Sequence, residues 1–170
     1  MRLIRCTRKV LVEVGLPENK LCDSDTTQLP LGDWYANNIK GCRRKCIIFV
    51  NEIMLFSFPV FGIHKSKMKN LADIFRTSLS EELKREGFED STIGKVLQLY
   101  KDVWIGKCTN KSILGNMNDL AYHYKNRPIN HEGFNIHDVY RATGEINRTP
   151  QKTLGWEYSI DKLRKAICDL

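Results

Sequence analysis

The sequence lacks any long apolar run. No segment approaches the roughly 18 consecutive apolar residues that a membrane-spanning helix needs. The first nine residues, MRLIRCTRK, carry a charge every few positions and contain no apolar core of the kind found in secretory signals. We therefore expect a cytoplasmic protein without a membrane segment, and the length of 170 residues suits a single domain spanning 1–170.

The motifs of common metal and nucleotide sites are also missing. Cys42 and Cys46 have a spacing compatible with a metal pair, but no second cysteine pair or histidine pair follows to complete four ligands. There is no P-loop, no Rossmann glycine fingerprint and no Gly-x-Ser-x-Gly nucleophile elbow. We expect reduced cysteines, of which Cys6, Cys46 and Cys108 lie in apolar runs as small core residues. The sequence thus predicts neither a metal nor a cofactor.

Acidic residues are fewer than basic residues. The chain has 27 Lys and Arg against 20 Asp and Glu, which gives a net charge of +7 and an isoelectric point of about 9.1. Basic residues gather at 40–45 (KGCRRK) and at 64–69 (HKSKMK). This balance favours an anionic partner, of which nucleic acid is a typical example, whereas the alternative is that lysine and arginine keep exposed turns solvated.

Apolar patterning predicts five strands, four of them in the first 58 residues. We expect a strand at 1–6, a three-stranded antiparallel meander within 34–58 and a further strand at 103–108. The run CIIFV is apolar on both faces, so this strand should be covered on both sides. Asn51–Glu52 is predicted to form a two-residue hairpin turn, and Pro59 to end the last meander strand because proline cannot donate to a ladder.

Helical spacing dominates the second half. Apolar residues three and four apart predict helices at 71–86, 91–102, 112–124, 135–144 and 159–170. Residues 16–33 are rich in Pro, Asp, Ser and Thr and are predicted to be a long loop. The fold class is therefore α+β: a mainly antiparallel sheet packed with helices from the second half.

The predicted helix at 112–124 contains four poor helix formers, Gly115, Asn116, Asn118 and Asp119. An apolar stripe holds it in place, and Gly115 on the border of that stripe costs roughly 1 kcal/mol relative to alanine. One explanation is that Gly115 admits a closely approaching backbone while Asn118 bonds to a neighbouring loop or strand. The alternative is a polar site. Asp119 and His123 share a face, either as an acid–base pair or as solvated charges.

Several stretches taken in order resemble an uncharacterised bacterial family, a domain of unknown function. They are LGDWYAN at 31–37, RRKCIIFVN at 43–51, LFSF at 55–58, NKSILGNMNDLAYH at 110–123 and NRTP at 147–150. The likeness covers nearly the whole chain and implies a stand-alone bacterial domain with no assigned reaction or cofactor. Polar residues recur in these motifs, and such groups can either hold an anion or cross-link loops.

Three functions remain open at this point. The first is a binding module for an anionic partner such as nucleic acid, with Trp34 or Tyr35 available for stacking and with binding residues Arg43, Arg44, Lys45, Asn118 and Arg148. The second is a protein-interaction or regulatory partner in a bacterial two-protein system, using the loop at 16–33. The third is an enzyme acting on a phosphate-containing substrate, with Asp119 and His123 as its catalytic residues.

Overall fold

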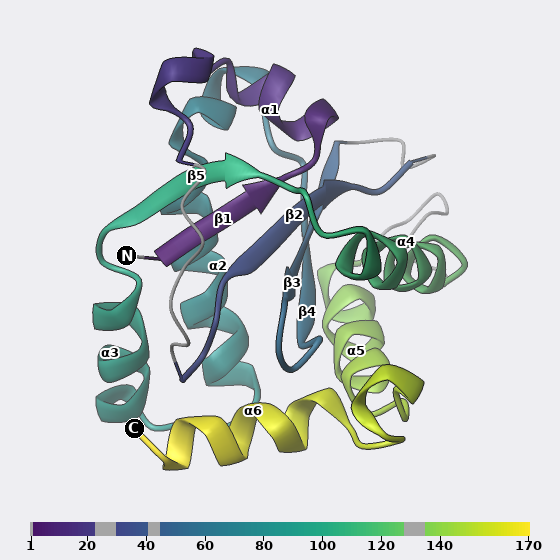
Figure 1. Ribbon diagram of the computed structural model, residues 1–170. Coiled ribbons are helices and arrows are strands. Elements are labelled where there is room, and N and C mark those ends of the chain that lie inside the picture. The colour runs from purple at the N-terminus through teal and green to yellow at the C-terminus, as the bar shows by residue number, and fades with distance from the viewer. Residues whose placement is uncertain (1, 23–29, 41–44, 128–134) are drawn as a thin grey trace.

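The computed structural model describes residues 2–22, 30–40, 45–127 and 135–170 (Figure 1). Within these residues a five-stranded sheet has the spatial order β4-β3-β2-β1-β5. The strands are β1 (Arg2–Cys6), β2 (Trp34–Asn38), β3 (Cys46–Asn51), β4 (Ser57–Phe61) and β5 (Val103–Lys107). β2, β3 and β4 pair antiparallel, which confirms the meander, whereas β1 lies parallel to both β2 and β5. The α+β class is confirmed, and the sheet is mixed.

Helices cover both faces of this sheet (Figure 1). One face packs against α1 (Arg8–Val14), α2 (Leu71–Arg85), α3 (Asp90–Leu99) and α6 (Ser159–Cys168). The other face packs against α4 (Lys111–Lys125) and α5 (Ile136–Asn147). Short 3-10 helices connect these elements, namely η1 (Glu18–Lys20), η2 (Lys65–Asn70) and η4 (Lys152–Leu154). The helices predicted for the second half are all present.

Strand alternation divides the core into two clusters. In β3, Ile47 and Phe49 face the α2 side while Ile48 and Val50 face the α4 side, and all four side chains are fully buried. The predicted two-sided burial of this strand is confirmed. Trp34 lies inside the first cluster, with its ring centroid 5.5 Å from that of Phe58.

The suggestion that Trp34 or Tyr35 stacks on a partner is wrong. Trp34 is only 2% exposed and Tyr35 only 3%. Both belong to β2, which packs against neighbours on each face of the sheet, so these rings form core contacts instead.

The turn between β3 and β4 is longer than predicted. Residues 52–56 form it, and the Asn51 side chain organises it by accepting hydrogen bonds from the backbone N of Ile53 and of Met54, each at 3.0 Å. Leu55 adopts a positive φ of 53° there. The side chain of Asn51 thus stabilises a longer turn, which does not need the glycine that two-residue turns favour.

Pro59 lies within β4, opposite Ile48, instead of ending the strand. β4 is at the edge of the described sheet, and an edge strand tolerates proline because one of its sides forms no ladder. None of the helices in the described part of the chain combines the length and the hydropathy that crossing a membrane requires.

Candidate functional site

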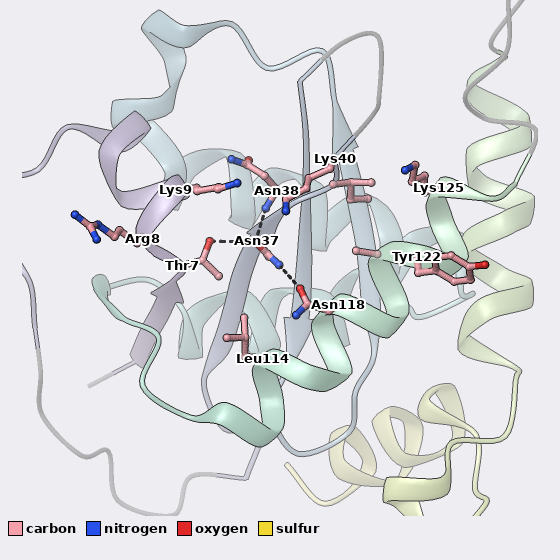
Figure 2. Close-up of a pocket in the computed structure, with 12 residues that line it drawn as sticks. Thr7, Arg8, Lys9, Asn37, Asn38, Lys40, Leu114, Asn118, Tyr122 and Lys125 are labelled. Atoms are coloured by element: carbon pink, nitrogen blue, oxygen red, sulfur yellow. Dashed lines mark hydrogen bonds between the residues drawn. The ribbon is translucent and has the colours of Figure 1, made fainter.

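A groove of about 420 Å³ opens where the parallel strands β1 and β2 end (Figure 2). Residues 7–9, which follow β1, and residues 37–40, at the end of β2, form its first wall, and α4 forms the opposite wall. The chain leaves β1 through α1 toward one face of the sheet and leaves β5 through α4 toward the other face. Ligands of open α/β sheets commonly bind at the carboxyl ends of strands where connections diverge in this way.

Positive charge surrounds this groove. Among the described residues that line it, none is acidic and four are basic: Arg8, Lys9, Lys40 and Lys125. All four side chains are exposed, and the first three form no ion pair within the described part of the chain. Uncompensated cations around a concave surface raise the local concentration of anions.

A ladder of polar side chains fixes the floor of the groove, as the dashed lines in Figure 2 show. Thr7 Oγ1 donates to Asn37 Oδ1 at 3.1 Å, and Asn37 Nδ2 donates to Asn118 Oδ1 at 3.2 Å. Asn37 Oδ1 also accepts from the backbone N of Asn38 at 2.9 Å. Asn118 therefore bonds to a neighbouring strand as predicted, and its Nδ2 has no hydrogen-bond partner among the described residues.

The α4 wall is less charged than the wall opposite. It contributes Leu114 and Ala121, both half-buried, together with Asn118 and Lys125. Tyr122 completes this wall with a side chain that is 65% exposed. The two walls thus differ, because three of the four cations lie on the first and the apolar side chains of α4 lie on the second.

The structure gives a different account of the weak helix formers in α4. Among the described residues, nothing outside its own helix lies within 4 Å of a Cβ atom added to Gly115, so the expected close approach of another backbone is wrong for this part of the chain. The helix is stabilised at its start by Asn110, whose Oδ1 accepts hydrogen bonds from the backbone N of Ser112 and of Ile113. Asn116 Oδ1 accepts from Thr153 Oγ1 at 3.2 Å.

The two residues predicted as catalytic lie elsewhere on α4. Asp119 and His123 are exposed, and neither side chain forms a hydrogen bond or ion pair with any other described residue. At 100° per residue, Asp119 lies roughly 115° and His123 roughly 155° around the helix from the centre of the sector that lines the groove. The aromatic contact of His123 is with Tyr122, at 6.2 Å between ring centroids.

The predicted basic residues are dispersed. Lys45 Nζ pairs with Glu13 at 3.0 Å. Arg148 donates to both carboxylate oxygens of Glu86, at 3.0 and 2.6 Å, and this hydrogen bonding raises the pKa of the guanidinium. Arg148 therefore joins the end of α5 to the end of α2. Arg43 and Arg44 lie outside the described residues.

Sequence reasoning missed most of the cations in the groove. Lys40 belonged to a recognised basic cluster, but Arg8 and Lys9 were not singled out. The available signal was a pair of basic residues directly after a strand, at the start of a helix. This pair lines a groove only because β1 pairs parallel with β2, and the local sequence does not reveal that pairing.

Polar residues of the motifs that carry the family resemblance serve mainly to cross-link strands and loops. Asp33 Oδ1 accepts from the backbone N of Leu3 at 3.0 Å, and its Oδ2 pairs with Arg5 Nε at 3.1 Å. Asn51 Nδ2 donates to the Leu31 carbonyl at 2.7 Å, and Asn147 bonds to the backbone of β4. All three polar side chains are buried. Holding loops and strands together accounts for these motif residues.

Groups of three or more His, Cys, Asp or Glu that could hold a metal ion do not occur in the described residues, and Cys42 lies outside that part of the chain. A family model described as Domain of unknown function (DUF6933) matches residues 3–162, which is nearly the full length. No curated protein and no solved structure matches the chain.

Proposed function

We propose that this chain, which belongs to the family described as Domain of unknown function (DUF6933), binds an anionic partner, nucleic acid, in the groove between α1 and α4. The observation that carries the proposal is the convergence of Arg8, Lys9, Lys40 and Lys125 on one concavity whose described lining contains no carboxylate. Nucleic acid fits this charge because its phosphates supply the sequence-independent part of protein binding. We place this activity in the cytoplasm.

Association suits the groove better than acid–base chemistry. Its described lining contains no Asp, Glu, His or Cys side chain, and its lysines and Tyr122 are exposed, without the burial that turns such groups into catalytic acids or bases. Asn37 and Asn118 are held by hydrogen bonds and offer polarity without charge. Arg43 and Arg44 follow Lys40 in the sequence and form part of the proposed binding set.

Salt-dependent binding tests this proposal. A labelled oligonucleotide is titrated against the protein, and the Lys9→Ala/Lys40→Ala variant is compared with the native chain. We expect the double variant to lose about tenfold in affinity and its slope of log K against log salt to flatten by about 1.4, since about 0.7 is lost per phosphate contact with a single strand.

The matched control removes the same charge elsewhere. Lys95 on α3 and Lys165 on α6 are exposed, and both helices pack on the face of the sheet opposite α4. The Lys95→Ala/Lys165→Ala variant should keep its affinity within about twofold of the native value and its slope of log K against log salt within about 0.5. Equal losses in the two variants would show that net charge acts without the groove and would refute the proposal.

A further inference from the structure

We infer that the groove accepts single-stranded nucleic acid, with phosphates along the α1–β2 wall and a base against α4. This inference rests on the proposed function and narrows its ligand. The difference between the two walls carries it: Arg8, Lys9 and Lys40 lie on one, and Leu114 and Ala121 on the other. A single strand has the same asymmetry, because its charged backbone runs along one edge and its base faces are free on the other.

The shape of the site argues against a duplex. Duplex DNA is read by a convex element, such as a helix or a two-stranded ribbon, that enters its major groove. Here the cations surround a concavity of about 420 Å³, which matches the size of pockets for small organic groups such as one nucleotide. In a duplex the base faces are stacked inside, so Leu114 and Ala121 would have no base face to contact.

Asn118 supplies the polar contact that a base needs. Its Oδ1 is occupied by Asn37 Nδ2, which leaves the two N–H groups of its own Nδ2 for an acceptor in the groove. Tyr122 lies on the side of Asn118 away from Asn37 (Figure 2) and is 65% exposed. A base leaving the groove past α4 can stack on this ring, as bases do in proteins that bind single strands.

Filling the groove tests the inference separately from the charge. Ala121→Gln adds bulk on the α4 wall and leaves every cation in place, and Ala72→Gln is the matched control because Ala72 is a half-buried alanine on α2. The native protein should bind a 12-nucleotide strand at least about tenfold more tightly than a duplex of equal length. Ala121→Gln should lose about tenfold for the strand but less than twofold for heparin, and Ala72→Gln should lose neither.

Asn118→Ala is a second variant at an exposed position, for use if thermal unfolding shows that Ala121→Gln is misfolded. It should weaken binding of the strand about fivefold at unchanged salt dependence, since no charge is removed. Two competitors identify the ligand further: a nucleoside monophosphate and poly-L-glutamate should each compete at least about tenfold less well than the strand, counted per charge.

The outcomes separate the inference from the proposed function. Binding of the duplex as tight as that of the strand, or equal behaviour of Ala121→Gln and Ala72→Gln, would overturn the inference while the lysine variants still support a nucleic-acid site. Equal competition by the monophosphate or by poly-L-glutamate would also overturn it, in favour of a free nucleotide or an acidic peptide. Absence of binding to every nucleic acid would defeat the proposed function itself.

Discussion

Glu82 is a carboxylate in a position where water hardly reaches it. It lies on α2 and is 5% exposed, and its partner Arg85 stacks on the Tyr140 ring of α5 at 3.4 Å from the centroid. Burial raises the pKa of Glu82 to about 7, because the lost hydration of the carboxylate outweighs the attraction of Arg85. Folding therefore favours the protonated form of this side chain.

This shift predicts a pH-dependent effect of Glu82→Gln. The folded pKa lies above the usual value of 4.5, so the contribution of Glu82 to stability is fully present below pH 4.5 and is lost as the pH rises to about 7. A glutamine at this position does not ionise, so its contribution to stability does not fall as the pH rises. We expect Glu82→Gln to exceed the native protein in unfolding free energy by about 2 kcal/mol at pH 8 and by much less at pH 5.

Urea unfolding at the two pH values measures the effect. Glu81→Gln is the matched control because Glu81 is the preceding residue, also faces Arg85 and is 57% exposed, so its pair contributes little. The control should stay within about 0.5 kcal/mol of the native protein at both pH values. A loss of stability in Glu82→Gln at pH 8 would mean that the ion pair with Arg85 outweighs the burial.

At the scale of single elements, α4 shows how one helix serves two surfaces. Its stripe of Ile113, Met117, Leu120 and Tyr124 is buried against the sheet, and the next sector of the helix lines the groove. The apolar stripe was predictable because helical spacing is a local property of the sequence. The role of the neighbouring sector in lining the groove was not predictable, since it depends on where the end of β2 lies.

Gly115 then has no packing role that the structure reveals. Its backbone is helical, and no described atom outside its own helix lies within 4 Å of the position that a Cβ atom would take. Gly115→Ala should therefore stabilise the protein by about 1 kcal/mol, because alanine restricts the unfolded chain and favours the helix. The measurement is the midpoint of thermal unfolding, together with the affinity for the oligonucleotide, which should not change.

Gly155 offers a contrasting control. A Cβ atom added there would likewise meet no described atom within 4 Å, but the φ of 70° at Gly155 lies in the left-handed region. Gly155→Ala should destabilise the protein by about 1 kcal/mol, since a side chain disfavours that conformation. If both alanine variants lowered stability, Gly115 would have a contact beyond the described residues.

At the scale of the whole molecule, the predictable features are those that depend on sequence neighbours. The two-sided burial of β3 and the stripes of α2 and α6 follow from apolar residues close in sequence. The groove does not, because it joins residues 7–9, 37–40 and α4, which meet only after β1 pairs with β2 and β5. Buried polar cross-links such as Asp33 with Arg5 were likewise invisible, since a motif shows a polar residue without its partner.

Asn147 makes a cross-link of this long-range kind. Its Oδ1 accepts from the backbone N of Ser57 at 2.9 Å, and its Nδ2 donates to the Ser57 carbonyl at 2.8 Å, across 90 positions of sequence. Ser159 Oγ donates to the same Oδ1 at 3.0 Å. One fully buried amide thus ties the edge strand β4 to the junction of α5 and α6.

Asn147→Ala should therefore cost about 2 to 3 kcal/mol, because it leaves the N–H of Ser57 buried without its acceptor, while the Ser57 carbonyl keeps its hydrogen bond from Tyr124 Oη. We expect a lower urea midpoint with an unchanged m value. Asn126→Ala is the control, since Asn126 is an exposed residue at the end of α4 and should change stability by less than about 0.5 kcal/mol. Equal midpoints for the two variants would show that β4 holds its place without Asn147, and the asparagine that begins the NRTP motif would then need an explanation outside the stability of the fold.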